Sequence, residues 1–219
     1  MDSSRSPIAR IALFVSSVAL TALGAEISIY VGPIPYTFQN MGLVFAGLTL
    51  PPRDALFAQL CYILLIALGL PIAAGGHGGP YILVGYTAGY LWGFPIASFL
   101  YSILSRSYLR RVRKELHNVN LKDACVLWLL SLVSAIPMYF LGFAVFYAYL
   151  SMGVSGLKAW SLRIASYLFR ANPSSYPLAL IALIVGVAIF VPQDAFMDHV
   201  LGLILAVTAH RVLKSRGLA

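Results

Sequence analysis

The sequence predicts an all-α integral membrane protein in which six transmembrane helices cross the bilayer and both termini face the cytoplasm. The first observation is composition: the 219 residues are 60% hydrophobic and 10% charged, with a mean hydropathy of +0.87. A soluble domain carries about 25% charged residues, so this chain cannot cover a water-facing surface and lipid must be its solvent. The second observation is that the apolar residues form long runs, and the third is that basic residues gather between these runs.

The apolar runs define the predicted helices. They lie at about 8–31, 37–50, 55–74, 81–105, 124–150 and 177–212. The first run is longer than the h-region of a signal peptide and suits a membrane span, so we expect no cleavable signal there. The second run covers only about 21 Å of a hydrocarbon core of about 30 Å. We therefore expect this short helix to be buried against its neighbours.

The last apolar run is too long for a single span, and Pro192 interrupts it. A proline inside a helix removes a backbone hydrogen bond, and its ring clashes with the preceding turn. We therefore expect residues 177–191 to form an apolar approach and residues 193–213 to form the sixth helix.

The positions of the basic residues predict the orientation in the membrane. Six spans place all of the 15 lysines and arginines on one side except Lys158, Arg163 and Arg170. Cytoplasmic loops carry the excess of basic residues, so the side that holds both termini is predicted to be cytoplasmic. The net charge of +8 is thereby explained by membrane topology, and nucleic acid is not an expected partner.

The connections on the outer side have an unusual composition. Residues 31–37 contain Pro33 and Pro35, which forbid a regular helix, and residues 75–80 read GGHGGP, a flexible turn that permits close backbone approach. Residues 151–176 form an insertion-like outer loop whose aromatic and basic residues are typical of a helix in the membrane interface. Because no internal repeat or separate soluble segment is found, residues 1–219 are predicted to form a single transmembrane domain.

Polar residues at the ends of the apolar runs predict a binding site. Six spans bring five of them to the outer side: Gln39, His77, Thr87, Tyr90 and Asp194. Polar side chains are costly in membrane segments and mark functional sites. A few convergent polar groups in an apolar cavity are typical of a small-molecule site, so these five are the predicted ligand-binding residues. Each also has a structural alternative, such as a first-turn helix acid at Asp194.

The sequence contains no pattern that predicts catalysis, a metal or a cofactor. Cys61 and Cys125 have no CxxC spacing, and His199 has no HxxxH partner. The sequence also lacks a GxxxxGK[ST] loop, which binds the phosphates of a nucleotide, so the chain cannot use ATP without a partner. We therefore expect a membrane protein that is not an enzyme and that depends on partners for energy.

Several ordered motifs carry a resemblance to a known family. They are IPYTFQ (34–39), AGL (46–48), GLP (69–71), GYTAGYLWGF (85–94) and GVAIFVPQD (186–194). Together they resemble the BioY family, the substrate-capture subunits (S components) of energy-coupling-factor (ECF) vitamin importers for biotin. The likeness covers most of residues 10–105 and 180–210, and it is weak over 106–179.

The resemblance implies an ECF S-component-like fold and a function in vitamin uptake. Biotin would be captured from outside and delivered inward across the cell membrane, with a transmembrane coupling subunit (EcfT) and two ABC ATPases as partners. The family docks its coupling subunit on a first-helix surface of small residues, and small residues four apart allow close helix approach in lipid. The matching residues here are Ala12, Ser16, Ser17, Thr21 and Ala25. Ordinary packing within the molecule is the alternative for this stripe.

Three positions depart from the family pattern. Tyr86 and Ala88 replace a proline and a glycine of the GPTGG signature, and Met197 replaces a lysine that lies three residues after the aspartate. In the family this lysine and the aspartate belong to the ligand site. Its loss leaves open a different vitamin or carboxylate precursor, such as lipoate. Lys158 and Arg170 in the long outer loop are candidates to supply the missing positive charge.

Two other classes of function remain as alternatives. GVSG (153–156) resembles the G-x-S-G of intramembrane serine proteases, with Ser155 as nucleophile and His199 in a later helix. However, Ser155 begins a loop with basic residues, whereas such a serine opens a membrane helix. A secondary transporter needs a coupling residue in mid-membrane, whereas the acids of this chain gather toward the outer side.

Overall fold

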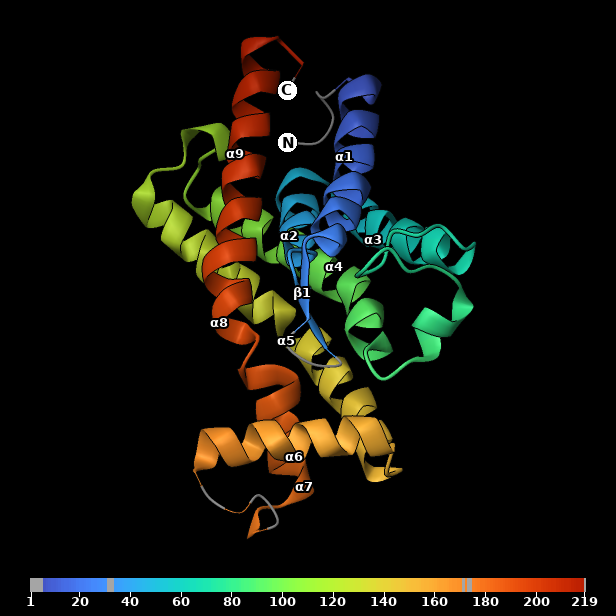
Figure 1. Ribbon diagram of the computed structural model, residues 1–219. Coiled ribbons are helices and arrows are strands. Elements are labelled where there is room, and N and C mark those ends of the chain that lie inside the picture. Colours follow the sequence, from blue (N-terminus) through green and yellow to red (C-terminus); the bar gives the residue numbers. More distant parts are fainter. Residues whose placement is uncertain (1–5, 31–33, 171, 173–174, 219) are drawn as a thin grey trace.

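The computed structural model describes residues 6–30, 34–170, 172 and 175–218, which form helices and one two-stranded hairpin (Figure 1). The first half contains α1 (Pro7–Glu26), β1 (Ser28–Tyr30), β2 (Pro35–Thr37), α2 (Asn40–Thr49), α3 (Pro52–Ala67), the 3-10 turn η1 (Pro80–Val84) and α4 (Ala88–Arg111). The second half contains η2 (Leu116–Asn118), α5 (Leu121–Ser151), α6 (Ser155–Phe169), α7 (Leu178–Leu183), η4 (Ile184–Ala188), α8 (Val191–Gln193), η5 (Asp194–Asp198) and α9 (His199–Ser215).

The short helix α2 lies at the centre of the molecule, and all ten of its residues are buried. It packs against α1, α4 and α9. Gly42 lets it approach α1, since a side chain at this position would overlap the backbone of Thr21. The predicted burial of this short helix is therefore confirmed.

Helices α4 and α5 pack closely along their length. A side chain at Gly89 would overlap the carbonyl oxygen of Leu141, and one at Gly93 would overlap the Cα atom of Met138. These two glycines, one turn apart on α4, allow the helix backbones to touch. This close approach fixes which residues of α5 face the interior of the protein.

The apolar segment from Leu178 to Ser215 is helical over most of its length, but a turn at Ile189 and Phe190 interrupts it. The predicted interruption near Pro192 is therefore confirmed, although the approach that precedes it is itself helical. Pro192 lies in the first turn of α8, where its missing N–H costs no helical hydrogen bond, and the π-helical stretches η4 and η5 lie on either side of it. The backbone N–H of Asp194 still donates to the carbonyl of Phe190 at 3.0 Å. Asp194 therefore lies at the end of the first helical turn after this interruption.

Three connections shape the end of the molecule that lies away from the termini. The strands β1 and β2 pair antiparallel, with Ser28 opposite Thr37; Pro33 lies outside the described residues. In the glycine loop 75–79, Gly75, Gly76 and Gly79 adopt positive φ angles of 73°, 70° and 110°, which glycine adopts without steric cost. The predicted turn is therefore confirmed, and Pro35 begins a strand as expected for a non-helical segment.

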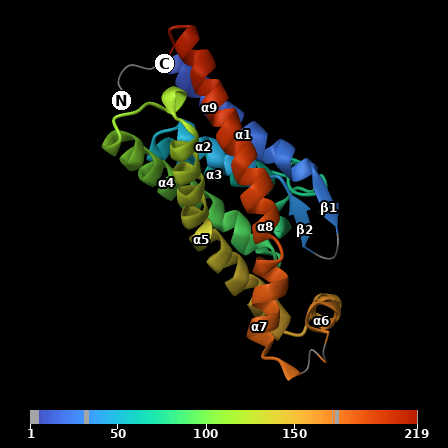
Figure 2. The same ribbon diagram turned by 90° about the vertical axis from the view of Figure 1, so that its left-hand side faces the viewer.

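Helix α6 forms within the loop that was predicted to hold an interfacial helix. It lies crosswise at the far ends of α5 and α7 (Figures 1 and 2). Leu157, Ser161 and Ala165 form its buried face, while Lys158 and Arg163 are exposed. This division of faces makes α6 amphipathic, and its place at a membrane surface remains a prediction.

Three helical segments are long and apolar enough to cross a membrane, namely Pro7–Glu26, Leu121–Ser151 and Leu178–Ser215. The beginning of α1 and the end of α9 lie at the same end of the molecule, opposite α6 (Figure 1). The structure is thus mostly helical, as predicted, with several apolar helices arranged lengthwise.

Candidate ligand-binding site

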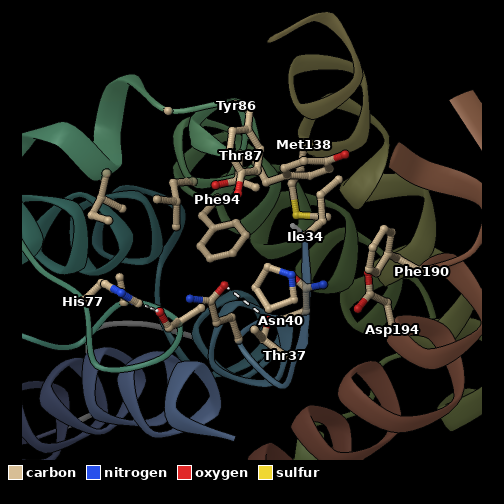
Figure 3. Close-up of a pocket in the computed structure, with 18 of the residues that line it drawn as sticks. Ile34, Thr37, Asn40, His77, Tyr86, Thr87, Phe94, Met138, Phe190 and Asp194 are labelled. Atoms are coloured by element: carbon tan, nitrogen blue, oxygen red, sulfur yellow. Dashed lines mark hydrogen bonds between the residues drawn. The ribbon is translucent and has the colours of Figure 1, made fainter. Parts of the chain in front are cut away.

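A cavity of about 350 Å³ lies between the hairpin, the glycine loop and the helices α2, α4, α5 and α8 (Figure 3). This volume falls within the range of small-molecule sites, which is roughly 300–1,000 Å³. All five residues predicted from the sequence line it: Gln39, His77, Thr87, Tyr90 and Asp194. The structure therefore brings them together, while their role in binding a ligand remains a prediction.

Gln39 lies directly before α2 and connects this helix to α3 and the glycine loop. Its Nε2 donates to the hydroxyl of Tyr62 at 2.9 Å, and that hydroxyl donates to the carbonyl of Ile72 at 3.0 Å. Its Oε1 accepts from Thr37 at 3.3 Å. Gln39 is thus held in one orientation at the wall of the cavity, and its position depends on contacts made by distant segments.

Asp194 brings the one carboxyl group that lines the described cavity. Its side chain is almost buried, and its Oδ2 accepts a hydrogen bond of 2.6 Å from the phenol of Tyr139 on α5. The side chain of Asn40, at the start of α2, also interacts with this carboxyl group. Acceptor and donor groups from three helices therefore meet at one side of the cavity.

Tyr90, Thr87 and His77 hold different positions around the cavity. The hydroxyl of Tyr90 donates to the carbonyl of Gly186, within the π-helical stretch η4. Thr87 lies directly before α4 and makes no capping hydrogen bond with its side chain. His77 is exposed in the glycine loop, and its Nδ1 lies 2.8 Å from the carbonyl oxygen of Ala74. Thr87 and His77 therefore retain hydrogen-bonding groups for a ligand.

A hydrogen-bonded network behind the cavity was not predicted. Asp198 is fully buried and accepts from the backbone N–H of Asn40 at 3.1 Å and from Nε2 of Gln193 at 2.6 Å. The same Nε2 atom also donates to the carbonyl of Thr37 at 3.1 Å. Asp198 thereby caps the start of α2 from a distant helix and supports three lining residues.

Tyrosines contribute four of the seven polar lining residues that sequence analysis missed. They are Tyr30, Tyr81, Tyr86 and Tyr139. Burial raises the pKa of the Tyr86 phenol above its ordinary value, and the nearby Tyr30 adds to the shift. Tyr86, at a position where the sequence departs from the family signature, thus stays a neutral hydrogen-bonding group. Only its place within that signature marked it in the sequence.

The cavity contains no lysine or arginine among the described residues that line it. Met197, at the position of the family's lysine, is 46% exposed and does not line the cavity. Lys158 and Arg170 are also exposed and lie outside the lining. His77 and Asp194 are therefore the basic and acidic side chains of the described wall.

The predicted docking stripe on α1 divides into two parts. Ser17, Thr21 and Ala25 are buried, and Thr21 accepts a hydrogen bond of 3.2 Å from Gln59 of α3. These three residues pack inside the molecule, so the alternative of ordinary packing describes them better than docking of a coupling subunit. Ala12 and Ser16 are exposed, and for them the docking role stays a prediction.

The structure gives no support to a serine–histidine pair of the predicted kind. His199 is buried, and its Nδ1 lies 2.7 Å from the hydroxyl of Ser131 on α5. The side chain of Ser155 lies outside the described residues. The described contacts of His199 are thus accounted for by packing between α5 and α9.

Comparison with known proteins gives relatives that are named as transporters. The chain is 31% identical to the biotin transporter BioY of Rhodobacter capsulatus over 186 residues, which are 84% of each protein. It is 44% identical to a probable biotin transporter BioY of Pyrococcus horikoshii over 93 residues, and 37% identical to one of Bacillus subtilis over 102 residues. These last two matches span about half the length of the relatives, 56% and 54%.

The fold and the full sequence lead to the same group of proteins. A crystal structure of the S-component for biotin from an ECF-type ABC transporter superposes with a TM-score of 0.64 over 94% of each chain, at 20% sequence identity. The model of the BioY family matches residues 1–215. A match of this extent, together with the R. capsulatus relative, shows that the chain belongs to the BioY family.

Proposed function

We propose that this chain is the substrate-binding subunit of an ECF-type importer in the cell membrane, and that it binds biotin in the cavity. The observation that carries this proposal is the cavity itself, in which polar groups from separate helices converge on an apolar space. The names of the relatives supply the ligand. Residues 1–219 act in this proposal as a single transmembrane substrate-binding domain.

The cavity suits the chemistry of biotin. The ureido ring of biotin carries N–H donors and a carbonyl acceptor, and the rest of the molecule is apolar apart from a terminal carboxylate. Asp194 and Asn40 offer an acceptor and a donor on one side, and Leu91, Phe94 and Met138 add apolar surface. A buried polar group of the protein that finds no partner atom on the ligand costs free energy. These side chains therefore discriminate between ligands.

The proposed topology has six spans, formed by α1, α2, α3, α4, α5 and the segment α7–α9, with both termini in the cytoplasm. The distribution of basic residues supports this orientation. The cavity then belongs to the outer half of the protein. A coupling subunit (EcfT) and two ABC ATPases complete the importer, which agrees with the lack of a nucleotide-binding loop in the sequence.

Titration of the purified protein with biotin, desthiobiotin and lipoate tests the proposal. We expect biotin to bind in the micromolar range or tighter, and Asp194→Asn to weaken binding at least tenfold because it alters the acceptor at the ring. Asp54→Asn is the matched control, since Asp54 pairs with Arg10 outside the cavity. If the wild-type protein shows no binding of biotin at micromolar concentrations, the proposed ligand is wrong.

A second ligand remains a candidate because the described cavity wall has no lysine or arginine. The same type of subunit for another vitamin or carboxylate precursor, such as lipoate, fits the apolar part of the lining. Tighter binding of lipoate than of biotin in the same titration favours this alternative.

A further inference from the structure

The cavity is polarised, with a carboxyl group at one side and an imidazole at the other. Figure 3 shows Asp194 and His77 on opposite sides of the lining. The carboxyl group of Asp194 accepts a hydrogen bond from Tyr139 and so presents acceptor oxygens to a ligand, whereas His77 belongs to a loop that opens to the surface. A ligand with an acidic group therefore places that group away from Asp194.

The hydrogen bonding of His77 determines what its ring can offer. Nδ1 lies 2.8 Å from the carbonyl oxygen of Ala74. A carbonyl oxygen can only accept, so this contact places a hydrogen on Nδ1. In the neutral ring Nε2 then has no hydrogen and is an acceptor. Nε2 can donate to a carboxylate only when the ring carries a second proton.

We infer that His77 binds the carboxylate of the ligand as an imidazolium, so that capture of an acidic vitamin is coupled to uptake of a proton. This inference rests on the proposed function and names the group that replaces a lysine or arginine in the described wall. Charge-assisted hydrogen bonds to a carboxylate are about twice as strong as neutral ones. Lower pH therefore strengthens binding of the acid relative to that of a neutral analogue with the same ring.

Three elements pack around the glycine loop, and each brings a titratable group. Glu26 at the end of α1 comes within 3.8 Å of the Cβ position of Gly76, Tyr30 of β1 faces Gly75, and Tyr81 of η1 faces Gly79. Glu26 is an acid that attracts the same imidazolium, so it competes with the ligand. The test must therefore separate Glu26 from His77.

The experiment compares biotin with biotinamide, which has the same shape without the charge, on the full chain in lipid nanodiscs between pH 6 and 8.5. We expect the wild-type protein to prefer biotin about tenfold at the low end, which corresponds to one charge-assisted contact. Calorimetry in buffers of different ionisation enthalpy should show proton uptake with biotin. His77→Gln should remove both the preference for biotin and the proton uptake.

Two further variants distinguish the role of His77 from that of Glu26. His77→Lys should retain the preference for the acid and lose its dependence on pH, while Glu26→Gln should retain the proton uptake. An equal affinity of the wild-type protein for biotin and biotinamide overturns the inference. A preference for biotin that persists in His77→Gln but is lost in Thr87→Val also overturns it, because Thr87 and not His77 would then bind the carboxylate. If the protein binds neither compound, the proposed ligand is wrong, and lipoate with lipoamide tests His77 in the same way.

Discussion

Asp198 illustrates how single polar residues hold this site together from a distance. It belongs to the last helical segment, yet its carboxyl oxygens accept from the first residue of α2 and from Gln193. A carboxylate at a helix start satisfies N–H groups that have no partner within the helix, and it complements the helix dipole. The position of Asn40 at the cavity therefore depends on a side chain that does not line it.

We predict that Asp198→Ala lowers the free energy of unfolding by about 1–3 kcal/mol, because buried N–H groups lose their acceptor. Thermal unfolding in detergent measures this change. Asp198→Asn retains one acceptor oxygen, so it should restore part of the stability and of the ligand affinity. Unchanged unfolding of Asp198→Ala would contradict the assigned role.

At the scale of residues, the sequence was sufficient for those at helix ends and insufficient for those in mid-helix. Gln39, Thr87 and Asp194 stand out because they are polar beside apolar runs. Tyr139 lies in the middle of a 31-residue helix, where a tyrosine that faces a cavity has the same local sequence as one that faces lipid. Only the packing of α5 on α4 decides between these two orientations.

At the scale of elements, the contact between α4 and α5 positions Tyr90 and Tyr139 in the wall of the cavity. It depends on backbone approach at Gly89 and Gly93. In lipid, such close packing supplies much of the association between helices, since hydrophobic burial contributes little there.

We predict that Gly89→Leu separates α4 from α5 and lowers the unfolding temperature, because a side chain there meets the backbone of α5, which cannot move aside. Overpacking costs about 1–3 kcal/mol or more. Gly156→Leu is the matched control: Gly156 is also helical, and nothing lies within 4 Å of its Cβ position. Equal unfolding temperatures for the two variants would show that the close approach is not needed.

Elements differ in how far the sequence defined them. The short second helix, the glycine turn and the helix in the long loop were predicted because composition marks each one. The helical form of the approach to Pro192 was missed, because the two π-helical stretches on either side of the proline have no local signature. The hairpin of three-residue strands was also missed, since strands this short show no periodicity.

At the scale of the whole molecule, the charges and the fold agree on an asymmetric protein. The start of α1 and the end of α9 lie together, and α6 lies at the opposite end (Figure 1). Arg10 near the start of α1 and Arg211 and Lys214 near the end of α9, which the sequence assigns to the cytoplasm, belong to the first of these ends.

We predict that a fluorescent protein fused after Ala219 folds in the cytoplasm and emits, whereas alkaline phosphatase inserted near Gly153 becomes active outside. The excess of basic residues on the terminal side is the physical reason. Exchange of the two reporters serves as the control and should silence both. Active phosphatase at the C-terminus would contradict the even number of spans.

The enclosure of α2 also has a consequence for how freely the sequence can vary. Helices α1 and α5 bury only about a third of their most apolar windows, 33% and 28%, so most of their positions accept any apolar residue that suits lipid. Every residue of α2 is buried against protein, and in such a close-packed interior a change of even one methylene group alters stability. A saturation scan that scores vitamin uptake should therefore find its least tolerant stretch of ten residues in α2.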